Sequence, residues 1–60
     1  MRLSIILPAL DEAAGIQATL APLQSLRALG HEVIVVDGGS TDGTPLLAAP
    51  LADRVLTAPR

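Results

Sequence analysis

A loop rich in carboxylates, hydroxyls and glycines follows a strongly apolar stretch near the middle of the chain. Residues 33–36 are four β-branched residues, and Asp37 comes directly after them. A carboxylate at the end of a buried strand can accept hydrogen bonds from a ribose hydroxyl or a base N–H. Gly38 and Gly39 would let a ligand approach the backbone closely. The same composition is also typical of a turn that only joins a strand to a helix.

Another loop, earlier in the chain, follows the apolar residues 3–7. Both apolar runs are nearly continuous, which is typical of strands buried on both faces, and Pro8 is expected to end the first of them. The loop after it spans residues 8–12 and ends in two acids. Because the carboxyl ends of parallel strands meet at one edge of a sheet, we expect the two loops to face the same side.

The elements between these loops are helical by pattern. Residues 13–29 carry apolar residues at steps of four, three and three, with Asp11 or Glu12 at the start and Gly30 just past the end. Pro22 predicts a kink or two short helices. Thr44 and Pro45 are typical of an N-cap and first turn.

The whole pattern is strand, helix, strand, helix and strand. The second helix is interrupted by Pro50 and is expected to end near Asp53, before a short strand at residues 55–57. This alternation predicts an α/β fold, a Rossmann-like β-α-β-α-β parallel sheet with right-handed crossovers. We expect the first strand to be central, with an unpaired outer edge that promotes aggregation of the isolated chain.

Several sharper motifs are absent. The chain has no lysine, so it lacks a P-loop, and no glycine follows the first strand as a dinucleotide fingerprint requires. Counted from Asp37, the loop fails the EF-hand pattern, because glycine and threonine stand where acids belong. The single histidine, His31, is interpreted as a surface or capping residue, since a zinc site needs several ligands.

Composition narrows the class of protein further. The formal net charge is −2, which argues against a nucleic-acid partner. No apolar run reaches the length of a membrane span. The absence of cysteine fits a cytoplasmic protein, which could be membrane-associated when full length. A chain of 60 residues without aromatic residues, disulfides or a zinc site buries too little to be stable alone, so we expect a larger protein or a partner.

Two segments carry a resemblance to a known family. Residues 5–12, Ile-Ile-Leu-Pro-Ala-Leu-Asp-Glu, and residues 35–44, Val-Val-Asp-Gly-Gly-Ser-Thr-Asp-Gly-Thr, resemble the first two loops of family 2 glycosyltransferases. The resemblance implies that residues 1–60 are a truncated, nucleotide-sugar-binding half of a GT-A domain. By position, the residues implied to line the nucleotide pocket are Pro8, Ala9, Leu10, Glu12, Asp37, Gly38 and Gly39.

The chain departs from the commonest family pattern at two positions. Many members have Asn in place of Asp11, and many have a second Asp in place of Gly38. That second carboxylate often contacts the base, so its loss leaves the identity of the base open. We expect Asp37 to take part of its role.

The resemblance also implies the chemistry. The full enzyme would transfer a sugar from a nucleotide-diphosphate donor to an unknown acceptor by displacement at the anomeric carbon. Residues downstream of Arg60 would bind a divalent metal, Mg or Mn, and would include the carboxylate base. We therefore expect no transfer by the 60 residues alone. One alternative is a stand-alone, non-catalytic nucleotide-binding or interaction module that completes its sheet with a partner. A nucleotidyltransferase of similar architecture fits less well, because it usually has a glycine-rich first loop.

Overall fold

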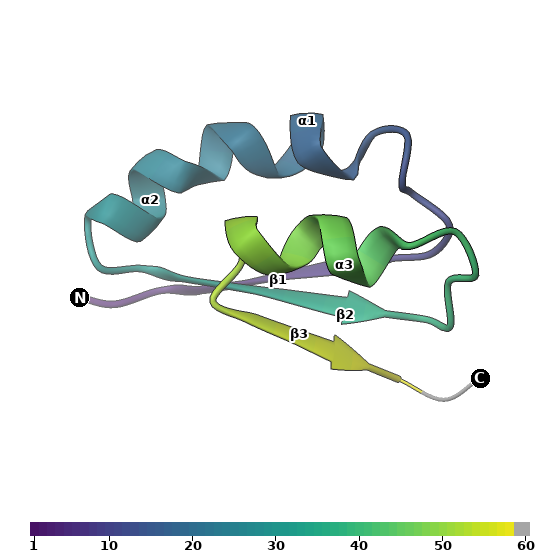
Figure 1. The fold of residues 1–60 in the computed structure, drawn as a ribbon. Coiled ribbons are helices and arrows are strands. Elements are labelled where there is room, and N and C mark those ends of the chain that lie inside the picture. Colours follow the sequence, from purple (N-terminus) through teal and green to yellow (C-terminus); the bar gives the residue numbers. More distant parts are fainter. Residues whose placement is uncertain (59–60) are drawn as a thin grey trace.

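Three parallel strands form the sheet of the computed structural model, which describes residues 1–58 (Figure 1). The strands are β1 (Ser4–Ala9), β2 (Glu32–Asp37) and β3 (Arg54–Thr57). The predicted α/β, Rossmann-like class is confirmed. The predicted central position of the first strand is wrong for this chain, because the order is β1-β2-β3. Within the described residues, β2 lies beside β1 and β3 lies beyond β2, so β1 forms one edge of the sheet.

Short helices connect the strands and all lie on one face of the sheet (Figure 1). Within residues 1–58, they are α1 (Ile16–Leu20), η1 (Ala21–Leu23), α2 (Gln24–Ala28), α3 (Thr44–Ala48) and η2 (Ala49–Leu51), where η marks a 3₁₀ turn. The break predicted at proline 22 is confirmed, because that residue lies in η1. Proline 50 likewise lies in η2, so the second helical segment ends slightly before the predicted point.

The core lies between the helices and the sheet. Val33 and Val35 are fully buried against Ile16, Leu20 and their neighbours. The predicted second strand is present, with residues 33–35 buried and Val36 half-buried, but within residues 1–58 another layer covers only its helix-facing side, so its predicted cover on both faces is wrong for this chain.

The opposite face of the sheet is largely open. Alternation along the strands places Ile6, Ile34 and Leu56 on it, and Ile6 is 64% exposed. The prediction that β1 is buried on both faces is therefore wrong for this chain, because within residues 1–58 no layer covers that side. β1 also runs through Pro8 instead of ending there. An edge strand tolerates proline, since its outer side needs no ladder hydrogen bond.

Both predicted helix starts shift in the structure. The carbonyl of Glu12 accepts the backbone N–H groups of Gly15 and Ile16, so the acids form a turn and the helix begins only at Ile16. At the second helix the N-cap is Gly43, with φ of +85°, and Thr44 is the first helical residue. A left-handed backbone at this point favours glycine over the predicted threonine cap.

The end of α2 matches the sequence pattern. Gly30 has φ of +94°, and its N–H donates to the carbonyl of Arg27 at 2.9 Å. The next N–H, that of His31, reaches back to Leu26 at 3.0 Å, which closes the helix end as expected for a C′ glycine. The His31 ring accepts the backbone N–H of Leu3 through Nδ1 at 3.0 Å, so this side chain ties the segment before β1 to the segment before β2 and does not cap the helix.

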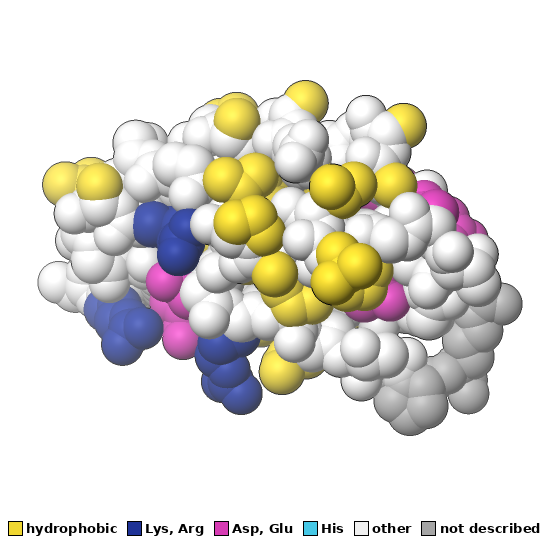
Figure 2. Space-filling view, in the orientation of Figure 1, with side chains coloured by type: hydrophobic (Ala, Val, Ile, Leu, Met, Phe, Trp, Pro, Cys, Tyr) yellow, Lys and Arg dark blue, Asp and Glu magenta, His cyan; other side chains and the backbone are white. Residues whose placement is uncertain are grey.

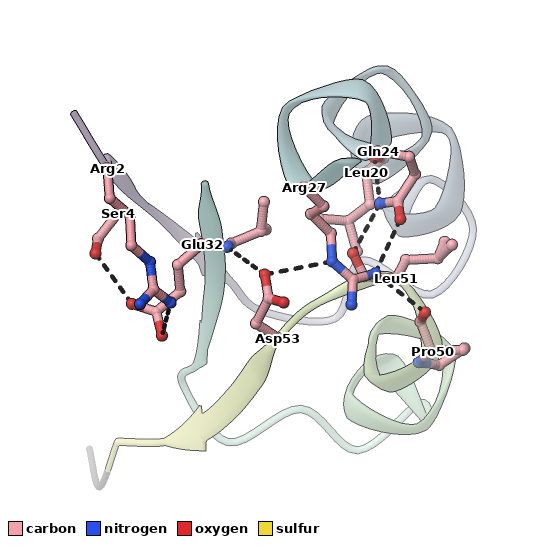
Figure 3. A network of polar contacts seen from close by, with 10 residues as sticks. Arg2, Ser4, Leu20, Gln24, Arg27, Glu32, Pro50, Leu51 and Asp53 are labelled. Carbon is pink, nitrogen blue, oxygen red and sulfur yellow. Dashed lines mark hydrogen bonds and ion pairs between the residues drawn. The ribbon is translucent and has the colours of Figure 1, made fainter. Parts of the chain in front are cut away.

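A polar network ties the helices to the amino-terminal side of the sheet (Figure 3). The Asp53 carboxylate accepts the backbone N–H of Val33 at 2.7 Å and pairs with Arg27 Nε at 3.3 Å. The N–H of Val33 and then the Arg27 guanidinium lower the pKa of Asp53. Arg27 also donates to Gln24 and to the Pro50 carbonyl, so one arginine links α2, η2 and the start of β3.

Hydrophobic and basic side chains are concentrated on different parts of the surface. Figure 2 shows hydrophobic side chains gathered over the helix layer and the basic side chains toward the end that holds the N-terminus. The two loops from the sequence analysis lie at the other end. Among residues 1–58, no helix is both long enough and apolar enough to cross a membrane.

Candidate functional site

A hollow lies at the carboxyl ends of β1 and β2, where the sequence predicts a ligand. It has a volume of about 400 Å³. Its lining residues are Pro8, Ala9, Leu10, Glu12, Val36, Gly38 and Ala58. A smaller hollow of about 190 Å³ adjoins it and shares Pro8, Ala9 and Glu12. The lining of the larger hollow is mostly apolar with a few polar groups, as in small-molecule sites generally.

The structure brings five of the seven predicted residues together in that lining. Asp37 and Gly39 are not among the lining residues, and Val36 and Ala58 were not predicted. Val36 follows from strand alternation, because it points to the face opposite Asp37. Ala58 lies there because its N–H donates to the Asp37 carbonyl at 2.8 Å, a pairing that only the register of the third strand fixes.

Asp37 is buried and faces its own loop. Only 1% of it is exposed, and its Oδ2 accepts the N–H groups of Gly39 at 3.0 Å and Ser40 at 2.8 Å. The Ser40 hydroxyl donates to Oδ1. The Ser40 hydroxyl, with the backbone N–H groups of Ser40 and Gly39, lowers the pKa of Asp37. In the structure Asp37 therefore stabilises the conformation of its own loop. Its contact with the base of a nucleotide stays a prediction.

The first loop, residues 8–13, and the second loop, residues 37–44, are joined by four side-chain hydrogen bonds. The bonds run from Asp11 N to Ser40 Oγ (2.8 Å), Glu12 N to Thr44 Oγ1 (2.9 Å), Ala13 N to Asp42 Oδ2 (3.1 Å) and Thr41 N to Asp11 Oδ1 (2.9 Å). The prediction that both loops face one side of the sheet is therefore confirmed. The first loop forms a wall of the hollow, and the second loop holds it in place.

Gly38 lines the hollow without a side chain of its own. Its N–H donates to the Ala9 carbonyl at 2.9 Å, so its backbone is fixed. A Cβ built on it would lie 3.7 Å from that carbonyl oxygen and 3.8 Å from Leu10 Cδ1. These are ordinary contacts, so a small side chain fits and a larger one would extend along the hollow.

The described residues offer no preformed metal centre. No group of three or more His, Cys, Asp or Glu side chains in residues 1–58 is arranged to hold a metal ion. Glu12 is the charged residue of the hollow's lining, and Asp37 and Asp42 are engaged in loop hydrogen bonds.

Comparison with known proteins gives a family match that includes both loops. The model of the family described as "Glycosyl transferase family 2" matches residues 4–59. The chain belongs to glycosyl transferase family 2. It is also 47% identical over 49 residues to the succinoglycan biosynthesis protein ExoA of Rhizobium meliloti (strain 1021). That match covers 80% of this chain but 15% of the relative, so the chain spans a small part of that protein's length. No solved structure matches significantly.

One departure from the common family 2 pattern now has a structural reason. Asp11 adopts φ of +49°, and its Oδ1 accepts the N–H of Thr41. Asparagine offers the same Oδ1 acceptor and also tolerates the left-handed region. Aspartate and asparagine can therefore do the same structural work at this position.

In the protein that carries this family 2 chain, we expect Asp11→Asn to leave the stability unchanged within about 0.5 kcal/mol. Asp11→Ala should lower it by about 1–2 kcal/mol, because alanine loses the bond to Thr41 and is strained at positive φ. Urea unfolding of the two variants measures the difference. Equal stability of the two would show that neither the acceptor nor the backbone conformation matters.

Acid should weaken the joined loops. The pKa of Asp42 is lowered, first by the Thr44 hydroxyl and then by backbone N–H groups, and the pKa values of Asp37 and Asp53 are lowered as well. A carboxyl whose folded pKa lies below its unfolded value stabilises the fold above the unfolded pKa and loses this as pH falls through the folded value. We expect Tm to fall as pH drops below about 4, with a smaller drop in Asp42→Asn. A Tm that stays level from pH 5 to pH 2.5 would contradict this account.

Proposed function

We propose that this chain forms the nucleotide-binding part of a glycosyltransferase that transfers a sugar from a nucleotide-diphosphate donor to an acceptor. The observation that carries the proposal is the hollow of about 400 Å³ at the carboxyl ends of two parallel strands in a family 2 chain. Ligands of open α/β sheets bind at this edge. The volume falls within the range of small-molecule sites.

The lining suits the nucleoside end of such a donor. Leu10, Val36 and Ala58 offer apolar contact to a flat base, and Gly38 adds no side chain to the lining. The donor's diphosphate carries negative charge, whereas Arg2, Arg27 and Arg54 do not line the hollow. We therefore propose that a divalent metal and residues other than these three arginines neutralise the diphosphate. In this proposal residues 1–60 are part of a GT-A domain and supply orientation, not catalysis.

A thermal-shift screen with UDP, GDP and dTDP, on the protein that carries this chain, tests the proposal. Binding of one nucleotide should raise Tm, since a ligand that binds only the folded state stabilises it. The nucleotide that gives the largest shift identifies the base. Failure of all three at millimolar concentration, with and without Mg²⁺ or Mn²⁺, would overturn the proposal.

One observation favours a second candidate, a non-catalytic module that completes its sheet with a partner. Among residues 1–58, β1 has no strand on its outer side, and Ile6 on the open face is 64% exposed. Exposed edges and apolar faces invite pairing with another chain. Size-exclusion chromatography separates the candidates, because the module requires a stable, defined oligomer of the 60 residues. Aggregation of the isolated 60 residues would favour the glycosyltransferase domain.

A further inference from the structure

Three consecutive backbone N–H groups of the first loop all end on side chains of the second loop. Asp11, Glu12 and Ala13 donate to Ser40, Thr44 and Asp42, at distances between 2.8 and 3.1 Å. Loop backbones usually satisfy such groups with water or local turns. Here the second loop fixes the path of the first at three successive residues.

Two of these bonds belong to relays with the same order of groups. In the first, the Asp11 N–H donates to the Ser40 hydroxyl, which donates to the Asp37 carboxylate. In the second, the Glu12 N–H donates to the Thr44 hydroxyl, which donates to Asp42 Oδ1. Each relay therefore runs from backbone N–H through hydroxyl to carboxylate.

The carboxylates fix the direction of both relays. An ionised carboxylate can only accept hydrogen bonds, so each hydroxyl donates its single hydrogen to its carboxylate. The oxygen lone pairs of the hydroxyl then accept the backbone N–H. Hydrogen bonds to an ionised acceptor are the stronger kind. Asp37 and Asp42 thus hold the hydroxyls in the orientation that receives the first loop.

The backbone N–H groups at which the relays begin lie beside the lining of the hollow. Leu10 and Glu12 line it, and the anchored N–H groups belong to Glu12 itself and to Asp11 between them. Asp11 is held at φ of +49°, a conformation uncommon for residues other than glycine. Thr44 is fully buried, so it contacts no ligand directly.

We propose that Ser40 and Thr44 are positioning residues, which set the wall of the nucleotide site through two N–H to hydroxyl to carboxylate relays. The inference rests on the proposed function, because it assigns the relays to donor binding. Without either hydroxyl, the wall formed by Leu10 and Glu12 would move among several positions. A nucleotide would then have to order the loop as it binds, which weakens affinity.

The test removes each hydroxyl and measures both the loop and the ligand. In the protein that carries this chain, Thr44→Val should raise the amide exchange rate of Glu12 about tenfold or more, and Ser40→Ala should do the same for Asp11. The Kd for whichever of UDP, GDP and dTDP binds best should rise about tenfold, measured well below Tm. Thr44→Ser and Ser40→Thr, which keep the hydroxyl, should restore both values to within about twofold.

Thr41→Val is the matched control. It removes a hydroxyl from the same loop but keeps the backbone N–H that donates to Asp11, so all four loop bonds survive. Its exchange rates and Kd should match those of the unchanged protein. Should Thr44→Val fail to fold, Ser40→Ala carries the test, because Ser40 is less buried.

The outcomes separate the two proposals. Binding by the unchanged protein together with an unaltered Kd in Thr44→Val and Ser40→Ala would overturn the positioning role alone. Failure of the unchanged protein to bind any of the three nucleotides would overturn the proposed function and, with it, the role in donor binding. A raised Kd that the hydroxyl-bearing variants do not restore would also contradict the relays.

Discussion

Gly38→Leu should abolish most nucleotide binding while leaving the fold intact. Gly38 lines the hollow beside Leu10, and its backbone lies outside the positive-φ region, so an L residue adopts it without strain. The added side chain would occupy space that a base needs. We expect affinity for the best of UDP, GDP and dTDP to fall at least about tenfold, equivalent to about 1.4 kcal/mol. Isothermal titration calorimetry measures this loss directly.

Gly38→Ala serves as the control for that experiment. A Cβ at this position makes only ordinary contacts, at 3.7 and 3.8 Å, with the Ala9 carbonyl oxygen and the Leu10 side chain. The alanine variant should therefore fold normally and keep affinity within about threefold. Tight binding by Gly38→Leu would mean that the nucleotide sits elsewhere.

Asp37→Ala should cause the largest loss of stability among single changes in the loops. The Asp37 carboxylate is buried and accepts three hydrogen bonds from Gly39 and Ser40. Alanine would leave the backbone N–H groups of Gly39 and Ser40 without their acceptor and release the Ser40 hydroxyl from its relay. In the protein that carries this chain we expect Tm to fall by roughly 5 °C. Circular dichroism during heating measures the change.

The conservative variant Asp37→Asn tests the cause. Its Oδ1 can still accept the two N–H groups, while its amide would meet the Ser40 hydroxyl as a donor. We expect a drop in Tm smaller than that of Asp37→Ala. If Asp37→Ala left Tm unchanged but removed nucleotide binding, Asp37 would instead act on the ligand, as the sequence analysis expected.

Several features could be predicted from sequence because local chemistry determines them. Four β-branched residues in a row gave the buried second strand, and Gly30 marked the end of α2. The prolines in η1 and η2 broke the helices as expected. The rule that loops at the carboxyl ends of parallel strands meet predicted that the two loops share one side of the sheet, and the resemblance to family 2 glycosyltransferases implied five residues of the hollow.

Other features depend on contacts between distant segments. The edge position of β1 follows from how the crossovers stack, which no local pattern reveals. The exposure of Ile6 depends on what covers the sheet. Thr44 fits an N-cap by type, yet its hydroxyl accepts the N–H of Glu12, 32 residues away.

The most direct test of the proposed nucleotide site is a titration followed by NMR. The ¹⁵N-labelled protein that carries this chain would be titrated with UDP, GDP and dTDP. For one nucleotide, the amide shifts should concentrate on Ala9, Leu10, Glu12, Gly38 and Ala58. Amides around Arg27 and Asp53, at the other end of the sheet, should stay in place. Shifts confined to that other end, or no shifts with any of the three nucleotides, would contradict the account.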